Sequence, residues 1–277
     1  MRITLLSNRD LPSCIALNYL LPQLTQHELC VFLSAQVGGS DKAAKPEALS
    51  SLKFYEQDLF NQIVFPLVDA KSESADASFK PQLLTFSGLE KFLSRPIEEL
   101  NDVNTVGLER LRQSEPEIVL SIRYGKILRN EAIALPKHGV LNLHSGRLPE
   151  YRGVMASFRA LQAGDAELFT TLHTIDDPGI DTGRILGYSP LPRDPDKSYL
   201  WHVLNLYRGG CQMLAEAVAE INAGAVLEGQ EQSSLAERGA YYTFPTQDEL
   251  DTFSASGLRL VDPDELIDLA RQFSYGH

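Results

Sequence analysis

The feature that most constrains the fold of this chain is a series of short aliphatic runs separated by segments with helical periodicity. The runs are RITLLS (2–7), LCVFLS (29–34), EIVLSI (117–122) and GVLNL (139–143). Strands that alternate with helices along the chain build a mainly parallel sheet with helices on its faces. The sequence therefore predicts an α/β domain.

Further patterned segments complete this prediction of a Rossmann-like, mainly parallel sheet flanked by helices. Two neighbouring apolar stretches, 168–175 and 184–191, have the pattern of paired strands. Pro12 suits the first turn of a helix, and Gly164 and Gly224 suit the ends of two others. The helices are expected at 12–24, 46–67, 104–114, 154–163 and 197–222. No element can be assigned between residues 70 and 100.

The character of the sequence changes after about residue 224. The chain continues with YYTFP (241–245) and with two short helical patterns, 247–253 and 263–273. We therefore expect two parts, a main domain over residues 1–224 and a small C-terminal appendage over residues 225–277.

Composition and charge restrict the classes of partner. The 277 residues carry a formal net charge of −12 at pH 7, and such an acidic surface repels phosphate backbones, so nucleic acid is not expected as a partner. No apolar stretch approaches the ~20 residues of a membrane span, and the N-terminal apolar run is too short for a signal peptide. Three scattered cysteines without CxxC spacing indicate reduced thiols in a cytoplasmic protein and no metal site.

Asn142 and His144 are the first candidates for chemistry. Residues two apart in a strand point to the same side, so both lie on one face at the carboxyl end of the predicted strand, where open α/β sheets bind ligands. An amide that donates to a developing oxyanion and an imidazole that handles a proton suit attack on a carbonyl group. The alternative is a histidine that is hydrogen-bonded to local backbone at a strand end.

Asp181 is the second candidate, in TLHTIDDPGIDTGRIL (171–186). It lies in a Gly- and Pro-containing turn, where aspartate serves turn formation at least as often as catalysis. Asp176 and Asp177 can cap the same turn. The tripeptide Asp-Thr-Gly also occurs in aspartic proteases, but their mechanism needs two such carboxylates and this chain has a single one.

Together these stretches resemble the 10-formyltetrahydrofolate-dependent formyltransferase family, which includes glycinamide ribonucleotide transformylase, methionyl-tRNA formyltransferase and sugar N-formyltransferases. The resemblance consists of Asn142-Leu143-His144, the turn Leu148-Pro149-Glu150-Tyr151-Arg152-Gly153 and the loop Asp181-Thr182-Gly183, in that order. IVLSIRYGKIL (118–128) resembles the strand and folate-pocket loop of the family. The similarity runs from about residue 100 to residue 190.

The resemblance implies transfer of a formyl group from 10-formyltetrahydrofolate to an amine. Asn142 would donate to the formyl oxygen, His144 would stabilise the same intermediate, and Asp181 would raise the pKa of the histidine and help to move the proton of the amine. His173 would support this site. The folate would be held by the loops that contain Arg123, Tyr124, Gly125, Ile127, Leu128, Asp176, Asp177 and Gly179.

Departures from the family pattern restrict the class of acceptor that we expect. The turn after the first strand, Leu6 to Asp10, has no glycine to cradle a ribonucleotide phosphate. Residues 210–277 hold 12 acidic and 3 basic side chains, which disfavours tRNA. Because the sequence begins on the first predicted strand, we do not expect one of the family's hydrolytic members, which carry an added N-terminal domain. A small amine remains, with an aminosugar nucleotide as the first choice and a hydroxylamine amino acid of the hydroxyornithine type, used in siderophore assembly, as the second.

Other classes of protein stay open at this point. The chain could be a folate-binding protein without turnover, because a fold does not imply an activity. An unrelated hydrolase is disfavoured because the GxSxG and HExxH patterns do not occur. Tyr241, Tyr242 and Phe244 could stack on a nucleobase or pack against the main domain. The sequence leaves the oligomeric state open, with a homodimer as one option.

Overall fold

The structure, a computed structural model, describes residues 1–35, 46–74, 80–233 and 239–274. Seven strands form one sheet in the order β3-β2-β1-β4-β5-β7-β8. The strands from β3 to β5 in this order run parallel, and β7 and β8 extend the sheet in antiparallel orientation. They are β1 (Arg2–Asn8), β2 (Glu28–Ser34), β3 (Glu98–Glu99), β4 (Ile118–Ile122), β5 (Val140–His144), β7 (Glu167–Thr174) and β8 (Ile185–Pro192). This sheet confirms the predicted fold class.

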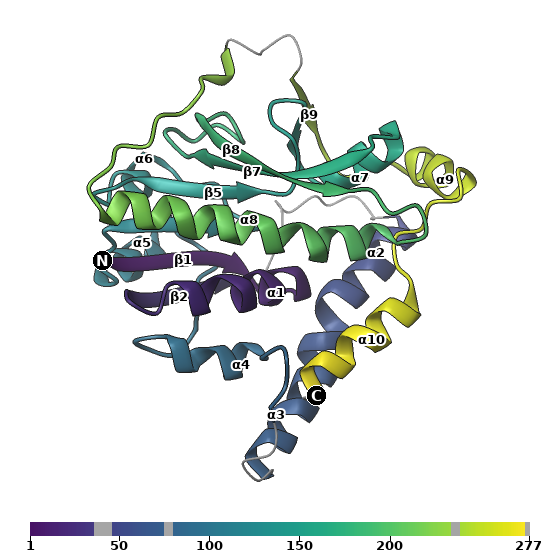
Figure 1. The fold of residues 1–277 in the computed structure, drawn as a ribbon, viewed down its shortest axis with the longest axis horizontal. Helices are drawn as coiled ribbons and strands as arrows, with labels where there is room; N and C mark the ends of the chain where they lie inside the picture. The colour runs from purple at the N-terminus through teal and green to yellow at the C-terminus, as the bar shows by residue number, and fades with distance from the viewer. Residues whose placement is uncertain (36–45, 75–79, 234–238, 275–277) are drawn as a thin grey trace.

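Helices cover both faces of the sheet (Figure 1). Leu5 belongs to an apolar cluster shared with α1 and α8, whereas its neighbour Leu6 belongs to a cluster shared with α5 and α6. This split follows from the alternation of side chains along a strand. The helices are α1 (Leu11–Leu20), α2 (Glu47–Lys53), α3 (Phe65–Ser74), α4 (Phe86–Leu89), α5 (Val106–Gln113), α6 (Asn130–Ile133), α7 (Ala156–Ala163), α8 (Tyr199–Asn222), α9 (Gln247–Ala255) and α10 (Pro263–Ser274).

Most predicted elements are confirmed, and the differences have local causes. The helix expected at 12–24 ends at Leu20 and continues as a 3-10 turn over Leu21–Gln23, because Pro22 has no N–H to donate to the preceding turn. The helix expected at 46–67 continues to Ser74 as α2, two π-helical stretches (Phe54–Asp58 and Phe60–Val64) and α3. The unassigned segment 70–100 holds α4 and the two-residue strand β3, which is too short to give a sequence pattern.

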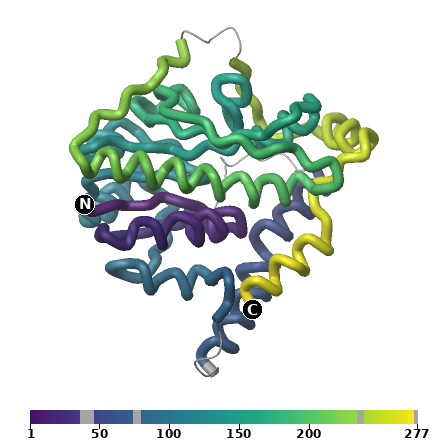
Figure 2. The backbone as a smooth tube through the Cα atoms, in the orientation of Figure 1, coloured from purple at the N-terminus to yellow at the C-terminus, as the bar shows by residue number. Residues whose placement is uncertain are grey.

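The segment after residue 224 packs on the rest of the chain. Strand β9 (Ala240–Tyr242) pairs in parallel with β6 (Tyr151–Gly153), forming a second, two-stranded sheet. Helix α10 lies along the helical run that contains α2 and α3 (Figure 2), and its Phe273 ring contacts the rings of Phe60 and Phe65. Tyr242 lies against Tyr151. Residues of α9 and α10 thus join the same core cluster as the sheet.

No helix within the described ranges is long and apolar enough to cross a membrane.

Candidate active site

Strand β5 carries Asn142 and His144 to the carboxyl end of the parallel strands. The antiparallel register of β5 and β7 places Asn142 directly opposite His173. The Asn142 Nδ2 atom lies 2.9 Å from His173 Nε2, and His173 Nδ1 donates to the Thr174 carbonyl at 2.7 Å. This contact between the Asn142 amide and the His173 ring fixes the direction of the amide.

Asp181 lies between the two histidines. Its Oδ1 atom is 3.6 Å from His144 Nδ1 and 3.6 Å from His173 Nε2. The Gly153 N–H donates to Asp181 Oδ2 at 2.8 Å. The structure therefore brings Asn142, His144 and Asp181 together from one strand, β5, and the loop between β7 and β8.

The loop that contains Asp181 has a strained backbone, and hydrogen bonds from Gln232 stabilise it. Asp181 has a φ of +54°, in the left-handed region that residues with a side chain rarely adopt. Gln232, a buried residue of the C-terminal segment, donates its side-chain N–H groups to the carbonyls of Asp181 (2.9 Å) and Gly183 (2.7 Å). Any side chain at Gly183 would overlap the Thr174 carbonyl, because a Cβ atom there would lie 1.8 Å from that oxygen. Such strain is retained where the surroundings over-determine the conformation, typically at functional sites.

The surroundings of Asp181 keep its carboxylate charged. Burial by itself raises the pKa of Asp181, but the nearby imidazoles of His144 and His173 and the Gly153 N–H outweigh this, so the pKa lies well below its usual range. His144 also has an oxygen at its other nitrogen, since Nε2 donates to the Tyr151 carbonyl at 2.7 Å. A His144 ring protonated at both nitrogens can donate to the Tyr151 carbonyl and face Asp181 at the same time.

His173 is the site residue that the sequence reasoning undervalued. It was expected only to support the site, but it contacts both Asn142 and Asp181. In the sequence, His173 lies in TLHTI (171–175), part of a segment with the pattern of a strand, and the structure forms strand β7 there. Only the register of β5 against β7 shows which residue faces Asn142.

The predicted folate-binding residues lie on two loops that pack on one face of the sheet. Leu128, from the loop after β4, and Ile175, next to the Asp176–Gly179 turn, belong to the same apolar cluster. Ile127 and Ile180 expose 52% and 37% of their surface, so each loop presents an apolar side chain. Such side chains suit the flat ring system of a pterin.

Side chains of several of these predicted residues make hydrogen bonds or ion pairs with other residues of the protein. The Tyr124 hydroxyl donates to the Leu100 carbonyl at 2.7 Å, and Arg123 is paired with Asp10. Asp177 accepts the Gly179 N–H at 2.6 Å and so closes its own turn. Asp176 accepts the Thr174 hydroxyl. The side chains of Asp176 and Asp177 thus shape the turn, and Gly125 adds no side chain.

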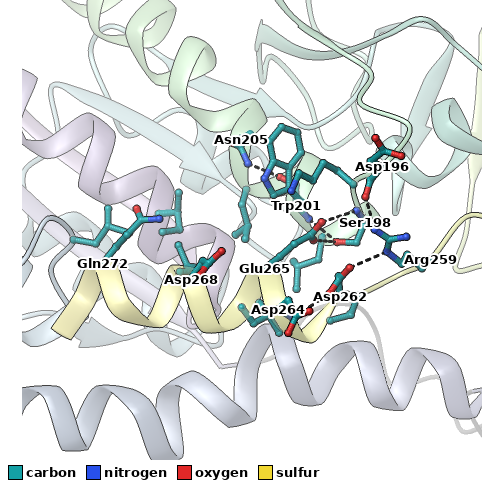
Figure 3. A pocket seen from close by; sticks show the side chains of 18 of the residues that line it. Asp196, Ser198, Trp201, Asn205, Arg259, Asp262, Asp264, Glu265, Asp268 and Gln272 are labelled. Carbon is teal, nitrogen blue, oxygen red and sulfur yellow. Dashed lines mark hydrogen bonds and ion pairs between the residues drawn. The ribbon is translucent and has the colours of Figure 1, made fainter. Parts of the chain in front are cut away.

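A cavity of about 270 Å³ lies elsewhere, between the start of α8 and helix α10 (Figure 3). The Ser198 hydroxyl donates to Glu265 Oε2 at 2.5 Å, and Arg259 Nε lies 3.1 Å from Asp262. Its lining includes neither strand β5 nor the Asp181 loop. The Ser198–Glu265 bond joins the start of α8 to α10, and Arg259 and Asp262 pair within the segment before α10.

The sequence of the chain matches the model of the formyl transferase family over residues 59–199, which is just over half of its length. The chain belongs to this family. The matched range contains Asn142, His144 and Asp181 and the two loops described above.

Similar curated sequences are methionyl-tRNA formyltransferases. The Thermus thermophilus protein is 37% identical over 114 residues, covering 41% of this chain and 37% of the relative. The Kosmotoga olearia protein is 32% identical over 132 residues, covering 47% of this chain and 42% of the relative. The matched part spans well under half of the length of these relatives.

Solved structures share the fold at low sequence identity. Glycinamide ribonucleotide transformylase 1 from Symbiobacterium toebii has a TM-score of 0.54 and 16% identity, over 82% of this chain and 91% of that one. An N-formyltransferase from Helicobacter canadensis, solved with folinic acid and dTDP-3-aminofucose, has a TM-score of 0.52 and 17% identity, over 87% and 70% of the two chains. These similarities support the Rossmann-like sheet.

Proposed function

We propose that the protein is an N-formyltransferase that moves the formyl group of 10-formyltetrahydrofolate to the amine of a small molecule, with an aminosugar nucleotide as the first acceptor class. The observation that carries this proposal is the convergence of Asn142, His144 and Asp181, with Asp181 Oδ1 3.6 Å from His144 Nδ1. An amide, an imidazole and an ionised carboxylate at one strand end form the set needed for acyl transfer to an amine.

Each residue has a defined part in the proposed reaction. Asn142, whose amide is oriented by His173, donates to the formyl oxygen as this atom gains negative charge. The formyl oxygen takes over the Nε2–H of His144 from the Tyr151 carbonyl. Asp181, which is ionised in the free protein, accepts a proton from the attacking amine and passes it to the leaving nitrogen of the folate.

The choice of a small acceptor rests on charge. The net charge is −12, and residues 210–277 contribute 12 acidic and 3 basic side chains. Binding of tRNA depends on neutralising its phosphates with basic groups, and in this segment acidic side chains far outnumber the basic ones. The similarity to methionyl-tRNA formyltransferases, confined to 41% of the chain for the Thermus protein, makes methionyl-tRNA the control acceptor. A hydroxylamine amino acid is the alternative small acceptor.

Donor binding is tested first, by thermal unfolding with and without folinic acid. At ~100 times its dissociation constant the ligand adds ~2.7 kcal/mol, which for a chain of this size raises the midpoint by roughly 5 °C or more. Acceptors are then compared by mass spectrometry: an aminosugar nucleotide, hydroxyornithine and methionyl-tRNA. We expect formylation of a small amine and an Asn142→Ala variant that is roughly 100- to 1000-fold slower. Unchanged unfolding at saturating folinic acid would contradict the proposal, and formylation of the tRNA alone would correct the acceptor.

A further inference from the structure

Three charged side chains beside the site take no part in the chemistry proposed above. Asp10 is fully buried, and Glu56 and Arg123 expose only 15% and 16% of their side chains. Arg123 donates to Asp10 Oδ2 from Nε at 3.1 Å and from Nη2 at 2.9 Å. Glu56 is more loosely attached, with its Oε2 atom 3.9 Å from Arg123 Nη2.

The sheet register puts this group at the same strand ends as His144. Leu143 of β5 pairs with Ile122 of β4, so Arg123, the next residue, leaves β4 beside His144. β1 pairs with β4 on the other side and leads to Asp10 three residues after Ser7, the partner of Ile122. The carboxyl ends of parallel strands are where open α/β sheets bind their ligands.

Two polar atoms in this group have no hydrogen-bond partner among the described residues. One is Glu56 Oε1, and the other is the hydroxyl of Tyr207, a fully buried residue of α8. The Tyr207 hydroxyl lies near Arg123 and near Ser145, which follows His144, yet neither makes a well-formed hydrogen bond with it. A buried polar group without a partner costs ~1–3 kcal/mol, so two of them around one arginine point to a missing ligand group.

Asp10 cannot be the group that receives a ligand, because its oxygens are already engaged. It caps α1 by accepting the Ser13 N–H at 2.8 Å, and it also accepts from Asn8 and Arg123. Glu56 retains a free oxygen. It lies in a π-helical stretch, Phe54–Asp58, a backbone form that is frequent at functional sites.

We propose that Glu56 binds the amine of the acceptor and removes one proton from its ammonium form, which makes it a catalytic residue of the acceptor side. The ammonium N–H bond breaks, its proton forms the carboxylic acid of Glu56, and its electron pair stays on the neutral amine nitrogen. That pair then forms the bond to the formyl carbon. The bond from this carbon to the folate nitrogen breaks, its electron pair stays on the folate nitrogen, and that nitrogen receives the second amine proton through Asp181. Glu56 returns its proton to solvent. This inference rests on the proposed formyltransferase function.

The charges around Glu56 suit this exchange at neutral pH. Burial raises the pKa of Glu56, Arg123 lowers it and Asp10 raises it, which together place it at about 7. Among the described residues, Tyr199 of α8 also faces Glu56, and Tyr207 of the same helix lies near Arg123; burial raises the pKa of both tyrosines. A base with a pKa near the working pH is the most effective one.

The test compares wild type, Glu56→Gln and Asp58→Asn. Asp58 lies two residues away in the same helical run and bonds only to Gln62 among the described residues, so Asp58→Asn is the matched control. Folinic acid binding is measured by calorimetry, and kcat/KM is measured between pH 6 and 9 with dTDP-3-aminofucose and with hydroxyornithine. We expect equal folinic acid affinity in all three proteins. In Glu56→Gln, kcat/KM for the amine should fall by ~100-fold or more and lose its rise through pH 7.

Tyr207→Phe gives a second readout that does not depend on Glu56. This variant should lower kcat/KM for the amine by a few fold and leave folding intact, since the lost hydroxyl has no hydrogen-bond partner among the described residues.

The outcomes separate the two proposals. Wild type that does not bind folinic acid contradicts the formyltransferase function itself. Wild type that formylates the amine, together with a Glu56→Gln variant of unchanged kcat/KM and pH profile, overturns the role of Glu56 alone. Donor binding without formylation of either amine also overturns the acceptor site.

Discussion

At the scale of single residues, the carboxylate of Asp181 lies between two imidazole rings, those of His144 and His173. Replacing it in Asp181→Asn keeps the size of the side chain and removes the charge between His144 and His173. We expect turnover to fall by ~100-fold or more, because the group that moves the amine proton is lost. Formyl transfer is measured with the acceptor found for wild type, and folinic acid binding serves as the control. A variant with wild-type turnover would contradict the role of Asp181.

The same residue predicts how stability changes with acid. The pKa of Asp181 is lower in the folded protein than in the unfolded chain, so its contribution is complete above about pH 4 and is lost as pH falls toward the folded value. Wild type should therefore lose more stability than Asp181→Asn between pH 5 and pH 3. Urea unfolding at both pH values checks this. Equal losses in the two proteins would show that the carboxylate is not stabilised in the fold.

Gln232 is a positioning residue on the C-terminal segment. Gln232→Ala removes the donors to the carbonyls of Asp181 and Gly183, and leaving buried acceptors unpaired costs ~1–3 kcal/mol. Because the φ of Asp181 is held by this loop, we also expect turnover to fall and its pH profile to shift. Gln212→Ala, which removes an exposed hydrogen bond to Glu216, should change neither. Loss of stability without a change in pH profile would indicate a purely structural role.

At the scale of elements, the pairing of β6 with β9 ties the C-terminal segment to the site. Gly153 has a φ of +95°, and a Cβ atom there would lie 2.2 Å from the Tyr242 carbonyl. Its N–H also binds Asp181. A change at this position should therefore disturb the small sheet and the site together.

The comparison of Gly153→Ala with Gly164→Ala isolates the close approach of the two strands. Gly164 also has a positive φ, +81°, but a Cβ atom there would meet nothing within 4 Å. The backbone strain of ~1–2 kcal/mol is common to both variants, and overpacking adds ~1–3 kcal/mol in Gly153→Ala alone. Urea unfolding and turnover should both be impaired more in Gly153→Ala. Equal losses of stability and turnover in the two variants would mean that β9 shifts to accommodate the added methyl group without a loss of stability.

At the scale of the whole molecule, α10 is part of the core around the helical run 47–74. Phe273 is fully buried against Phe60 and Phe65, so Phe273→Ala should cost ~3–5 kcal/mol. Ile267→Ala, on the same helix but with 51% of that side chain exposed, should cost under ~1 kcal/mol. Calorimetry should show one transition shifted to lower temperature. A separate early transition would instead support an independent unit over residues 225–277.

The elements that could be predicted from sequence are those whose local pattern is strong. The aliphatic runs of β1, β2, β4 and β5 and the long amphipathic helix α8 appear in the structure close to their expected bounds. β3 and β6 could not be predicted, because two or three residues give no periodicity and these strands exist only through their partners β2 and β9.

The sequence by itself determined the fold class, the place of Asn142 and His144 on one strand end and the loop that holds Asp181, because periodicity and turn residues act locally. Only the tertiary structure decided what these residues contact. Strand register put His173 opposite Asn142, and the return of the C-terminal segment brought Gln232 to the Asp181 loop. The meeting of Asp10, Glu56 and Arg123 joins three elements far apart in the chain. Such contacts depend on the packing of distant segments, and no local pattern encodes them.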